Sequence, residues 1–215
     1  MAINIQSFQF NAFQENTFVV WDDERNCVII DPGCYSRHEQ QELLDFIKEN
    51  NLVPRALLNT HAHIDHVLGN SFVMNSFEID YYLHENDLPT LKSVSSYAHV
   101  YGFEGYEVSP EPNKFLRHNQ TLIFGKLDIK VYFTPGHAPG HVVFYFPTGN
   151  FVVNGDVLFQ GSFGRVDLPG GDLETLKKSI FETMFQLPEE TIVYCGHGPE
   201  TAVAREKKFN YIHQF

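Results

Sequence analysis

Apolar residues recur along the N-terminal part of this sequence in short runs that end in turn residues. Alternating and β-branched positions predict strands over Ile3–Phe10, Thr17–Trp21 and Cys27–Ile30. The last of these runs into Asp31-Pro32-Gly33, a tripeptide typical of a tight turn. Because the connections between the three runs are short, we expect an antiparallel meander.

The pattern then changes to helical spacing. Apolar residues three and four positions apart between Leu43 and Ile47 predict an amphipathic helix, and Ser36 is a residue type that caps a helix N-terminus. A short apolar strand, Ala56–Leu58, leads directly into the polar segment Thr60–His66. Several polar side chains are therefore expected at the carboxyl end of a strand.

The rest of the chain repeats this style. Helices are predicted near residues 67–77 and 84–93 with a strand at 79–83 between them, whereas residues 95–112 show no period and predict a surface loop. Later elements are expected as strands at 120–124, 127–133, 142–146, 151–154 and 191–194, and as helices at 173–187 and from 200 toward 213. Strand clusters with helices in both halves are typical of an α+β protein in which two sheets pack face to face beneath outer helices.

Length and composition fit one folded unit. The 215 residues are 43% hydrophobic and 20% charged, which is enough apolar material for one core, so residues 1–215 are expected to form a single domain. The N-terminal segment lacks the pattern of a secretion signal, and no apolar run approaches the roughly 18 residues of a membrane span. We therefore expect a cytoplasmic protein without membrane contact. The three cysteines form no CxxC pair and predict free thiols, and the net charge of −12 disfavours a nucleic acid partner.

Four potential metal ligands stand in one run of six residues: His61, His63, Asp65 and His66. Such an HxHxDH pattern would arise by chance in about one chain in a thousand of this composition. Imidazole nitrogen and carboxylate oxygen are the ligands of a borderline divalent ion such as zinc, and a tight turn can aim two of these residues at one ion and two at another. The run therefore predicts a metal site.

Three later segments each place a ligand-type residue just after a predicted strand: Thr134–His141, Asn154-Gly155-Asp156 and Cys195–Glu200. Together with the HxHxDH run, they resemble the metallo-β-lactamase superfamily, and within it the glyoxalase-II-like hydrolases. Further landmarks of that family are matched by Phe13–Thr17, Ile30–Gly33 and Gly164–Asp172. The resemblance covers essentially the whole chain and implies the four-layer αββα sandwich, an arrangement that periodicity alone does not establish.

The resemblance also implies a role for seven residues. Two divalent metal ions are expected; zinc is the leading candidate, and iron and manganese accept the same ligands. By matching positions, the first metal would be bound by His61, His63 and His137, and the second by Asp65, His66 and His197, with Asp156 bridging the two.

Two cations that share one solvent molecule would lower its pKa to roughly 7, so that hydroxide is available at neutral pH without a side-chain base. The hydroxide would attack an ester-like carbonyl, a metal would take up the oxyanion charge, and a thiolate or alkoxide would leave. Asp65 is a candidate proton relay in addition to its role as a ligand.

Several other residues keep two interpretations. Asp31 orients a ligating imidazole, caps its own turn, or does both. His141 is expected to form structural hydrogen bonds rather than to bind metal, because His137 already fills the family's position. The tyrosines of the 95–112 loop either line a pocket mouth or pack within the loop.

Arg165 lies in a glycine-rich segment soon after Asp156. A guanidinium at this place is suited to grip a substrate carboxylate. An internal pair of Arg165 with Asp167 or Asp172 is an equal alternative.

The leading functional hypothesis is a thioesterase similar to glyoxalase II, which would convert an acylated glutathione such as S-lactoylglutathione to the free acid and the thiol. The larger glyoxalase II proteins carry a helical C-terminal domain that helps to hold glutathione, and only one helix is expected after His197 here. The compact relatives without that domain are the nearer resemblance.

One alternative is a persulfide dioxygenase, a relative that is similar in Gly164–Asp167 but uses a single iron held by two histidines and one aspartate. Another is a different ester or lactone hydrolase of the same fold. A drug-hydrolysing β-lactamase is disfavoured because such members usually lack the His66-type ligand, and an RNA-processing nuclease is disfavoured by the acidic charge. A metal-binding partner without hydrolysis is the remaining possibility.

Overall fold

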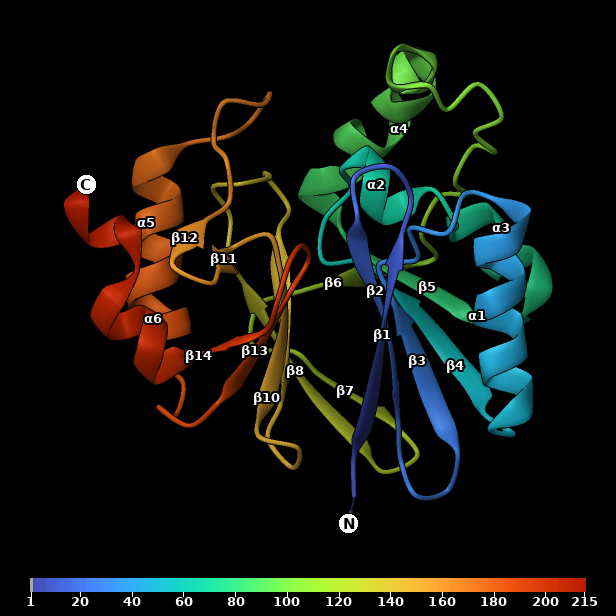
Figure 1. Cartoon of the computed structure of the whole chain (residues 1–215), viewed down its shortest axis with the longest axis horizontal. Coiled ribbons are helices and arrows are strands. Elements are labelled where there is room, and N and C mark those ends of the chain that lie inside the picture. The colour runs from blue at the N-terminus through green and yellow to red at the C-terminus, as the bar shows by residue number, and fades with distance from the viewer. Residues whose placement is uncertain (1) are drawn as a thin grey trace.

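Two six-stranded sheets form the centre of the protein, and helices cover the outer face of each sheet (Figure 1). This computed structural model describes residues 2–215. The first sheet has the order β1 (Asn4–Phe10), β2 (Glu15–Trp21), β3 (Asn26–Ile30), β4 (Val53–Leu58), β5 (Asp80–His84) and β6 (Lys114–Leu116). The second sheet has the order β14 (Thr201–Ala202), β13 (Ile192–Cys195), β10 (Phe151–Gly155), β9 (Val142–Phe146), β8 (Leu127–Phe133) and β7 (Thr121–Phe124). The expected αββα sandwich is confirmed.

The helices lie in two outer layers and at one end of the sandwich. Beside the first sheet are α1 (Arg37–Glu49) and α3 (Asn70–Ser76), and beside the second are α5 (Leu173–Glu182) and α6 (Val203–Phe209) (Figure 1). At the end of the sandwich lie α2 (Ile64–Val67) and α4 (Leu88–Tyr97). Short 3-10 turns, η1 (Glu85–Asp87), η2 (Ala98–Tyr101), η3 (Met184–Gln186) and η4 (Tyr211–Gln214), and a small hairpin of β11 (Leu158–Phe159) and β12 (Ser162–Phe163) complete the chain.

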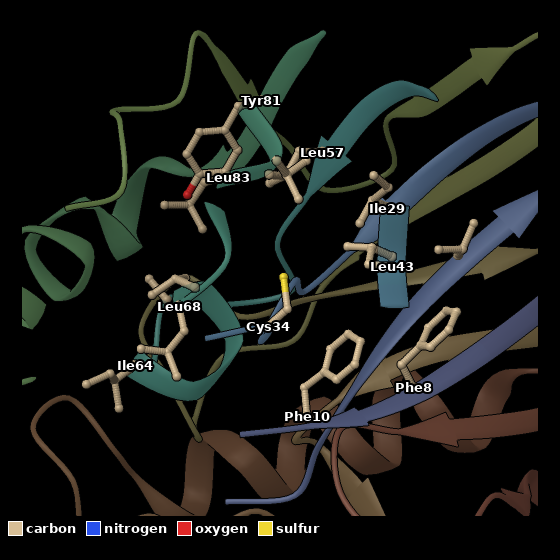
Figure 2. Close-up of a cluster of buried hydrophobic side chains, with 14 of the residues drawn as sticks. Phe8, Phe10, Ile29, Cys34, Leu43, Leu57, Ile64, Leu68, Tyr81 and Leu83 are labelled. Atoms are coloured by element: carbon tan, nitrogen blue, oxygen red, sulfur yellow. The ribbon is translucent and has the colours of Figure 1, made fainter. Parts of the chain in front are cut away.

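Alternation along the strands explains the layers. Val19 of β2 faces the helices of the first sheet, while its neighbours Phe18 and Val20 face the second sheet. Figure 2 shows the helix-side cluster, in which Phe8, Phe10 and Leu43 meet. Because successive side chains point to opposite faces, each sheet is buried on both sides, as a four-layer arrangement requires.

The N-terminal predictions are confirmed. The strands β1, β2 and β3 pair antiparallel, as the short connections indicated. Ser36 caps α1: its hydroxyl accepts a hydrogen bond from the Glu39 N–H, and the Glu39 carboxylate accepts one from the Ser36 N–H. This capping box fixes where the helix begins.

Other boundaries differ from the prediction. The helix expected over 67–77 is divided into α2 and α3 at Gly69, whose N–H donates to Pro32 O at 2.7 Å. A Cβ on Gly69 would lie 2.5 Å from the Cys34 Sγ, so this close approach, and not helical periodicity, sets the local backbone. The irregular segment predicted from residue 95 begins later, because α4 continues to Tyr97 and η2 follows it.

Short elements with few residues were missed. The strand β6 and the hairpin β11–β12 have no sequence period of their own, and the helix predicted from residue 200 starts at Val203 after the strand β14. The helix predicted over 173–187 ends at Glu182 and is followed by η3. Within residues 2–215, no helix combines the length and apolar character needed to cross a membrane.

Candidate metal centre

The structure brings all seven predicted ligand residues together at one end of the two sheets. The loop after β4 and the helix α2 carry His61, His63, Asp65 and His66, whereas the loops after β8, β10 and β13 carry His137, Asp156 and His197. Three groups have potential ligand atoms within 4.8 Å of one another: His61, His63 and His137; Asp65, His66 and His197; and Asp31, His61 and His66. The first two are the groups that the resemblance implied, and the third places Asp31 beside one histidine of each.

Asp156 lies between the two groups. Its Oδ2 is 3.5 Å from the His137 Nε2 and 3.5 Å from the His197 Nε2, and its Oδ1 is 3.6 Å from the His66 Nε2. One carboxylate therefore contacts ligand nitrogens of both groups. This position suits a carboxylate that bridges two cations.

Most of the imidazoles are held by their outer nitrogen. An oxygen within hydrogen-bond reach of Nδ1 leaves Nε2 to face the centre, which is how metal-binding histidines are commonly oriented. The Nδ1 contacts are His61 to Thr60 Oγ1 at 3.0 Å, His66 to Asp31 Oδ2 at 3.2 Å, His137 to Arg165 O at 2.7 Å and His197 to Phe13 O at 3.2 Å. His63 differs, because its Nδ1 faces inward, 2.9 Å from the His137 Nε2.

The inward-facing atoms fit divalent cations. The buried His61 Nε2, His66 Nε2 and Asp156 Oδ1 have no hydrogen-bond partner among the described residues. Orphaned polar atoms in a protein interior are costly, and two cations, one in each ligand group, would satisfy all three. Because the donors are imidazole nitrogens and carboxylate oxygens without a cysteine, the site suits zinc, iron or manganese.

The pKa values of the ligand histidines shift in opposite directions in the two ligand groups. Burial lowers the pKa of His61, and burial together with the neighbouring His137 lowers the pKa of His63 to about 3. Both imidazoles are therefore neutral, the form that binds a metal. Burial would also lower the pKa of His66 and of His197, but the nearby Asp65 and Asp156 carboxylates raise both.

The pKa values of the two carboxylates, Asp65 and Asp156, are lowered. Burial would raise the pKa of Asp156 and of Asp65, but the His66 imidazole and the other histidines hold both below the ordinary range. The carboxylates and the neighbouring histidines thus favour each other's charged form. A bound cation would take the place of a proton between them.

Asp31 anchors the first ligand loop. Its carboxylate accepts hydrogen bonds from the Thr60 N–H (2.7 Å) and the Thr60 hydroxyl (2.6 Å), and it contacts the His66 imidazole. Asp31 also occupies the turn with a left-handed φ of 49°. Within the described residues, the carboxylate makes no hydrogen bond to that turn, where the Gly33 N–H donates to the Thr17 hydroxyl instead. The contacts of Asp31 therefore support the interpretation that it orients a ligating imidazole.

Two residues of the matched landmark Phe13–Thr17 also gain a physical role. Asn16 donates from its side-chain amide to Cys195 O and to Gly198 O, both at 2.9 Å, and so holds the loop that carries His197. Glu15 is fully buried behind His66, with its Oε1 3.8 Å from the His66 Nδ1, and burial raises its pKa. The segment Phe13–Thr17 therefore supports the ligand histidines from behind.

His141 lies outside both ligand groups. Its Nε2 accepts a hydrogen bond from the Asp156 N–H at 3.1 Å, and its ring stacks on His61 with centroids 4.7 Å apart. This contact orients the backbone of the bridging residue, in line with the predicted hydrogen-bonding role.

Asp87 was missed by the sequence analysis. It is fully buried at the end of η1, and its carboxylate accepts from the Ala62 N–H (2.8 Å) and from the Gly140 N–H (2.7 Å). One carboxylate thus ties the loop of His61 to the loop of His137. Burial raises its pKa to about 6, so it is largely ionised at neutral pH. An aspartate before a helix carries no motif, so only the tertiary structure reveals this contact.

Arg165 forms the internal pair that was one of its two interpretations. Its Nε and Nη2 donate to the two carboxylate oxygens of Asp167, each at 2.7 Å, and the two side chains are 61% and 68% exposed. Asp172 instead caps α5 by accepting from the Thr175 N–H. The Arg165 guanidinium is therefore near the site and exchangeable, because exposed ion pairs contribute only about 0–1 kcal/mol.

A cavity of about 1160 Å³ opens over the ligand groups. His63, Asp65, His137, Asp156 and His197 line its floor. The 95–112 segment contributes Tyr97 and Tyr101 to the wall, whereas Tyr106 packs against the helix-side core.

The comparison with family models identifies the class of protein. The model of the metallo-beta-lactamase superfamily matches residues 10–197, and the chain therefore belongs to this superfamily. It is a metal-dependent hydrolase of that class, with a histidine-rich site for divalent metals.

Individual relatives and solved structures are similar to this chain over most of its length. The probable metallo-hydrolase YqgX of Bacillus subtilis is 40% identical over 94% of this chain and 91% of its own length. The hydroxyacylglutathione hydrolase GloC of Haemophilus influenzae is 34% identical over 97% of both chains. Among solved structures, the BLEG-1 B3 metallo-beta-lactamase has a TM-score of 0.88 at 34% identity, covering 97% of this chain and 98% of that one. The protein TTHA1623 in a di-iron-bound form has a TM-score of 0.85 at 37% identity, covering 96% and 98%.

Proposed function

We propose that this protein is a thioesterase that hydrolyses acylated glutathione, with S-lactoylglutathione as the first substrate to test. The reaction adds water across the thioester, so that the acyl carbon gains an oxygen and the sulfur leaves as a thiol. The observation that carries the proposal is the pair of complete ligand groups with Asp156 between them. The likeness to the Haemophilus hydrolase supports the choice of substrate.

When bound, two divalent cations supply electrophilic activation of a carbonyl and lower the pKa of a coordinated water to roughly 7. The residues of the chain provide the setting for this chemistry. Asp65 lines the cavity beside the ligand histidines, so its carboxylate is placed to hold a proton during turnover. Arg165 exchanges Asp167 for a substrate carboxylate at small cost.

The complete second group favours this proposal over a persulfide dioxygenase, for which a single iron would suffice. Asp65, His66 and His197 would have no task as ligands in a one-metal enzyme. The name of one structural neighbour, a B3 metallo-beta-lactamase, makes a β-lactam a necessary comparison substrate.

The test is steady-state hydrolysis of S-lactoylglutathione by protein of measured metal content, with wild type, His61→Ala and Asp156→Ala. We expect turnover by wild type and a loss of more than ~100-fold in both variants, beyond the ~10–100-fold typical of outer-sphere partners. His38→Ala, an exposed histidine on α1, is the matched control and should retain full activity.

Three results would contradict the proposal. Substantial activity in Asp156→Ala would exclude the bridging role of this carboxylate. One iron per chain with sulfite formed from glutathione persulfide would favour the dioxygenase. Hydrolysis of a β-lactam with no hydrolysis of thioesters would favour the lactamase.

A further inference from the structure

The cavity wall beside His197 is aromatic. Phe13 presents its carbonyl oxygen to the His197 Nδ1, while its ring is 40% exposed and faces the cavity. The ring of Phe159 lies with its centroid 6.1 Å from that of His197 on the same cavity. Two aromatic side chains therefore stand next to a residue of the second ligand group.

Further aromatic rings continue this wall. Tyr101 packs against Phe13 with centroids 5.6 Å apart, and Tyr97 packs against Tyr101 at 5.8 Å. Phe163 lines the cavity from the hairpin β11–β12. We call Phe13, Tyr97, Tyr101, Phe159 and Phe163 the aromatic rim. Edge-to-face packing of this kind presents flat apolar faces to a ligand ring.

The hairpin half of the rim is fixed in place. Buried Glu206 accepts from the Gly161 N–H at 2.9 Å, and buried Asn210 donates to Ser162 O at 2.6 Å. At the outer side, Phe163 packs against Phe215 with centroids 5.7 Å apart. The hairpin part of the wall is therefore preformed, which lowers the entropic cost of binding a rigid group there.

Charge is scarce along the same wall. Of the described residues that line the cavity, Arg165 alone is a lysine or arginine, and Asp167 occupies the Nε and Nη2 edge of its guanidinium. A carboxylate-bearing group has a partner only at Arg165. The aromatic rim suits a group without charge.

We propose that the aromatic rim binds the acyl group of the thioester and selects acyl groups that are bulky and apolar, above all those that carry an aromatic ring. This inference rests on the proposed thioesterase function. The glutathione portion carries charged carboxylates and is directed to Arg165, so the apolar part of the cavity is left for the acyl chain. Lactoyl and acetyl groups are then accepted but poorly matched.

The test compares kcat/KM for S-phenylacetylglutathione and S-acetylglutathione, two thioesters with the same leaving thiol. We expect wild type to prefer the phenylacetyl substrate at least ~10-fold. Phe159→Ala should lower that ratio ~3- to 10-fold, since each aromatic contact contributes a modest amount. Phe209→Ala is the matched control, because Phe209 is 67% exposed and does not line the cavity, and its ratio should be unchanged.

Competitive inhibition gives a second readout. Free phenylacetate should inhibit competitively at concentrations at least ~10-fold below those of acetate, and Phe159→Ala should remove most of this difference. Circular dichroism of each variant shows whether the fold is retained. Phe159→Leu, which keeps an apolar side chain, replaces Phe159→Ala if that variant does not fold.

The outcomes separate the two proposals. Turnover of both thioesters without an acyl preference, or a preference that survives Phe159→Ala, overturns the acyl subsite alone. The acetyl thioester of phenylmethanethiol carries its aromatic ring on the thiol portion. If Phe159→Ala lowers kcat/KM for this thioester alone, the aromatic rim binds the thiol portion, and the proposed acyl subsite is overturned. No hydrolysis of any thioester by metal-loaded protein overturns the proposed function and this inference with it.

Discussion

The two sheets supply the candidate metal centre in different ways. The first sheet delivers four ligand residues from one continuous run, because β4 ends where the His61–His66 segment begins. The second sheet delivers three single residues from three separate loops. A local motif therefore builds one half of the site, while sheet topology builds the other half.

The support of the two halves differs accordingly. In the first half, a single carboxylate, that of Asp31, contacts both Thr60 and His66 and so holds both ends of the run. In the second half, each ligand has a separate partner: Arg165 O for His137, His141 for the Asp156 N–H and Phe13 O for His197. One substitution should disturb the first half as a unit, whereas the second half should fail one ligand at a time.

The strongest test of this difference is Asp31→Ala. Removing the carboxylate leaves the buried Thr60 N–H beside His61 unpaired and frees His66, so we expect kcat/KM and the affinity for both metals to fall ~100-fold. The free energy of unfolding should fall by about 1–3 kcal/mol for the unsatisfied group. Metal titration and urea unfolding measure the two effects separately.

The matched control is Asp22→Ala. Asp22 is also a buried turn aspartate, and its carboxylate accepts from the N–H groups of Glu24, Asn26 and Lys126 far from the site. It should lose stability while its metal affinity is unchanged. Equal losses of metal affinity in both variants would mean that Asp31 acts only through overall stability.

A smaller effect is expected at Asp87, whose carboxylate connects the loop of His61 to the loop of His137. Asp87→Asn replaces one of the two acceptor oxygens that hold Ala62 and Gly140, so the loops of His61 and His137 should separate slightly. We expect a loss of ~10-fold in first-metal affinity, measured by competition with a chelator, and little change at the second metal.

Gly140→Ala disturbs the same connection from the loop that carries His137. A Cβ there would lie 2.6 Å from the Asp87 nitrogen and must push the two loops apart. Its metal affinity should change in the same direction as that of Asp87→Asn. If Asp87→Asn weakens both metals equally, the carboxylate does not serve the first ligand group in particular.

The same contrast explains what the sequence could predict. The HxHxDH run and the long strands could be predicted from local sequence pattern. His137, Asp156 and His197 were assigned by the family resemblance, and each lies in the loop that follows a strand. Asp87 and Asn16 act through backbone groups of distant loops, which no local pattern encodes. The split at Gly69 and the hairpin β11–β12 likewise depend on tertiary contacts with Pro32, Cys34, Glu206 and Asn210.

The smallest effect is expected at the exposed edge of the second half. Asp167→Asn removes the charge that occupies Arg165, so the guanidinium is free to bind a substrate carboxylate. Because an exposed pair contributes about 0–1 kcal/mol, KM for S-lactoylglutathione should fall only ~2- to 5-fold, with kcat nearly unchanged. The gain should shrink in 0.5 M salt, where the Debye length is only a few ångströms.

Arg165→Gln should raise the same KM, and the acetyl thioester of mercaptoethanol, which has no carboxylate, should show neither change. An equal response of the charged and the uncharged thioester would mean that Arg165 shapes the cavity rather than binding the substrate carboxylate. In that case the cavity would hold substrate through the aromatic rim alone, and Arg165 would serve only the His137 loop, through its carbonyl oxygen.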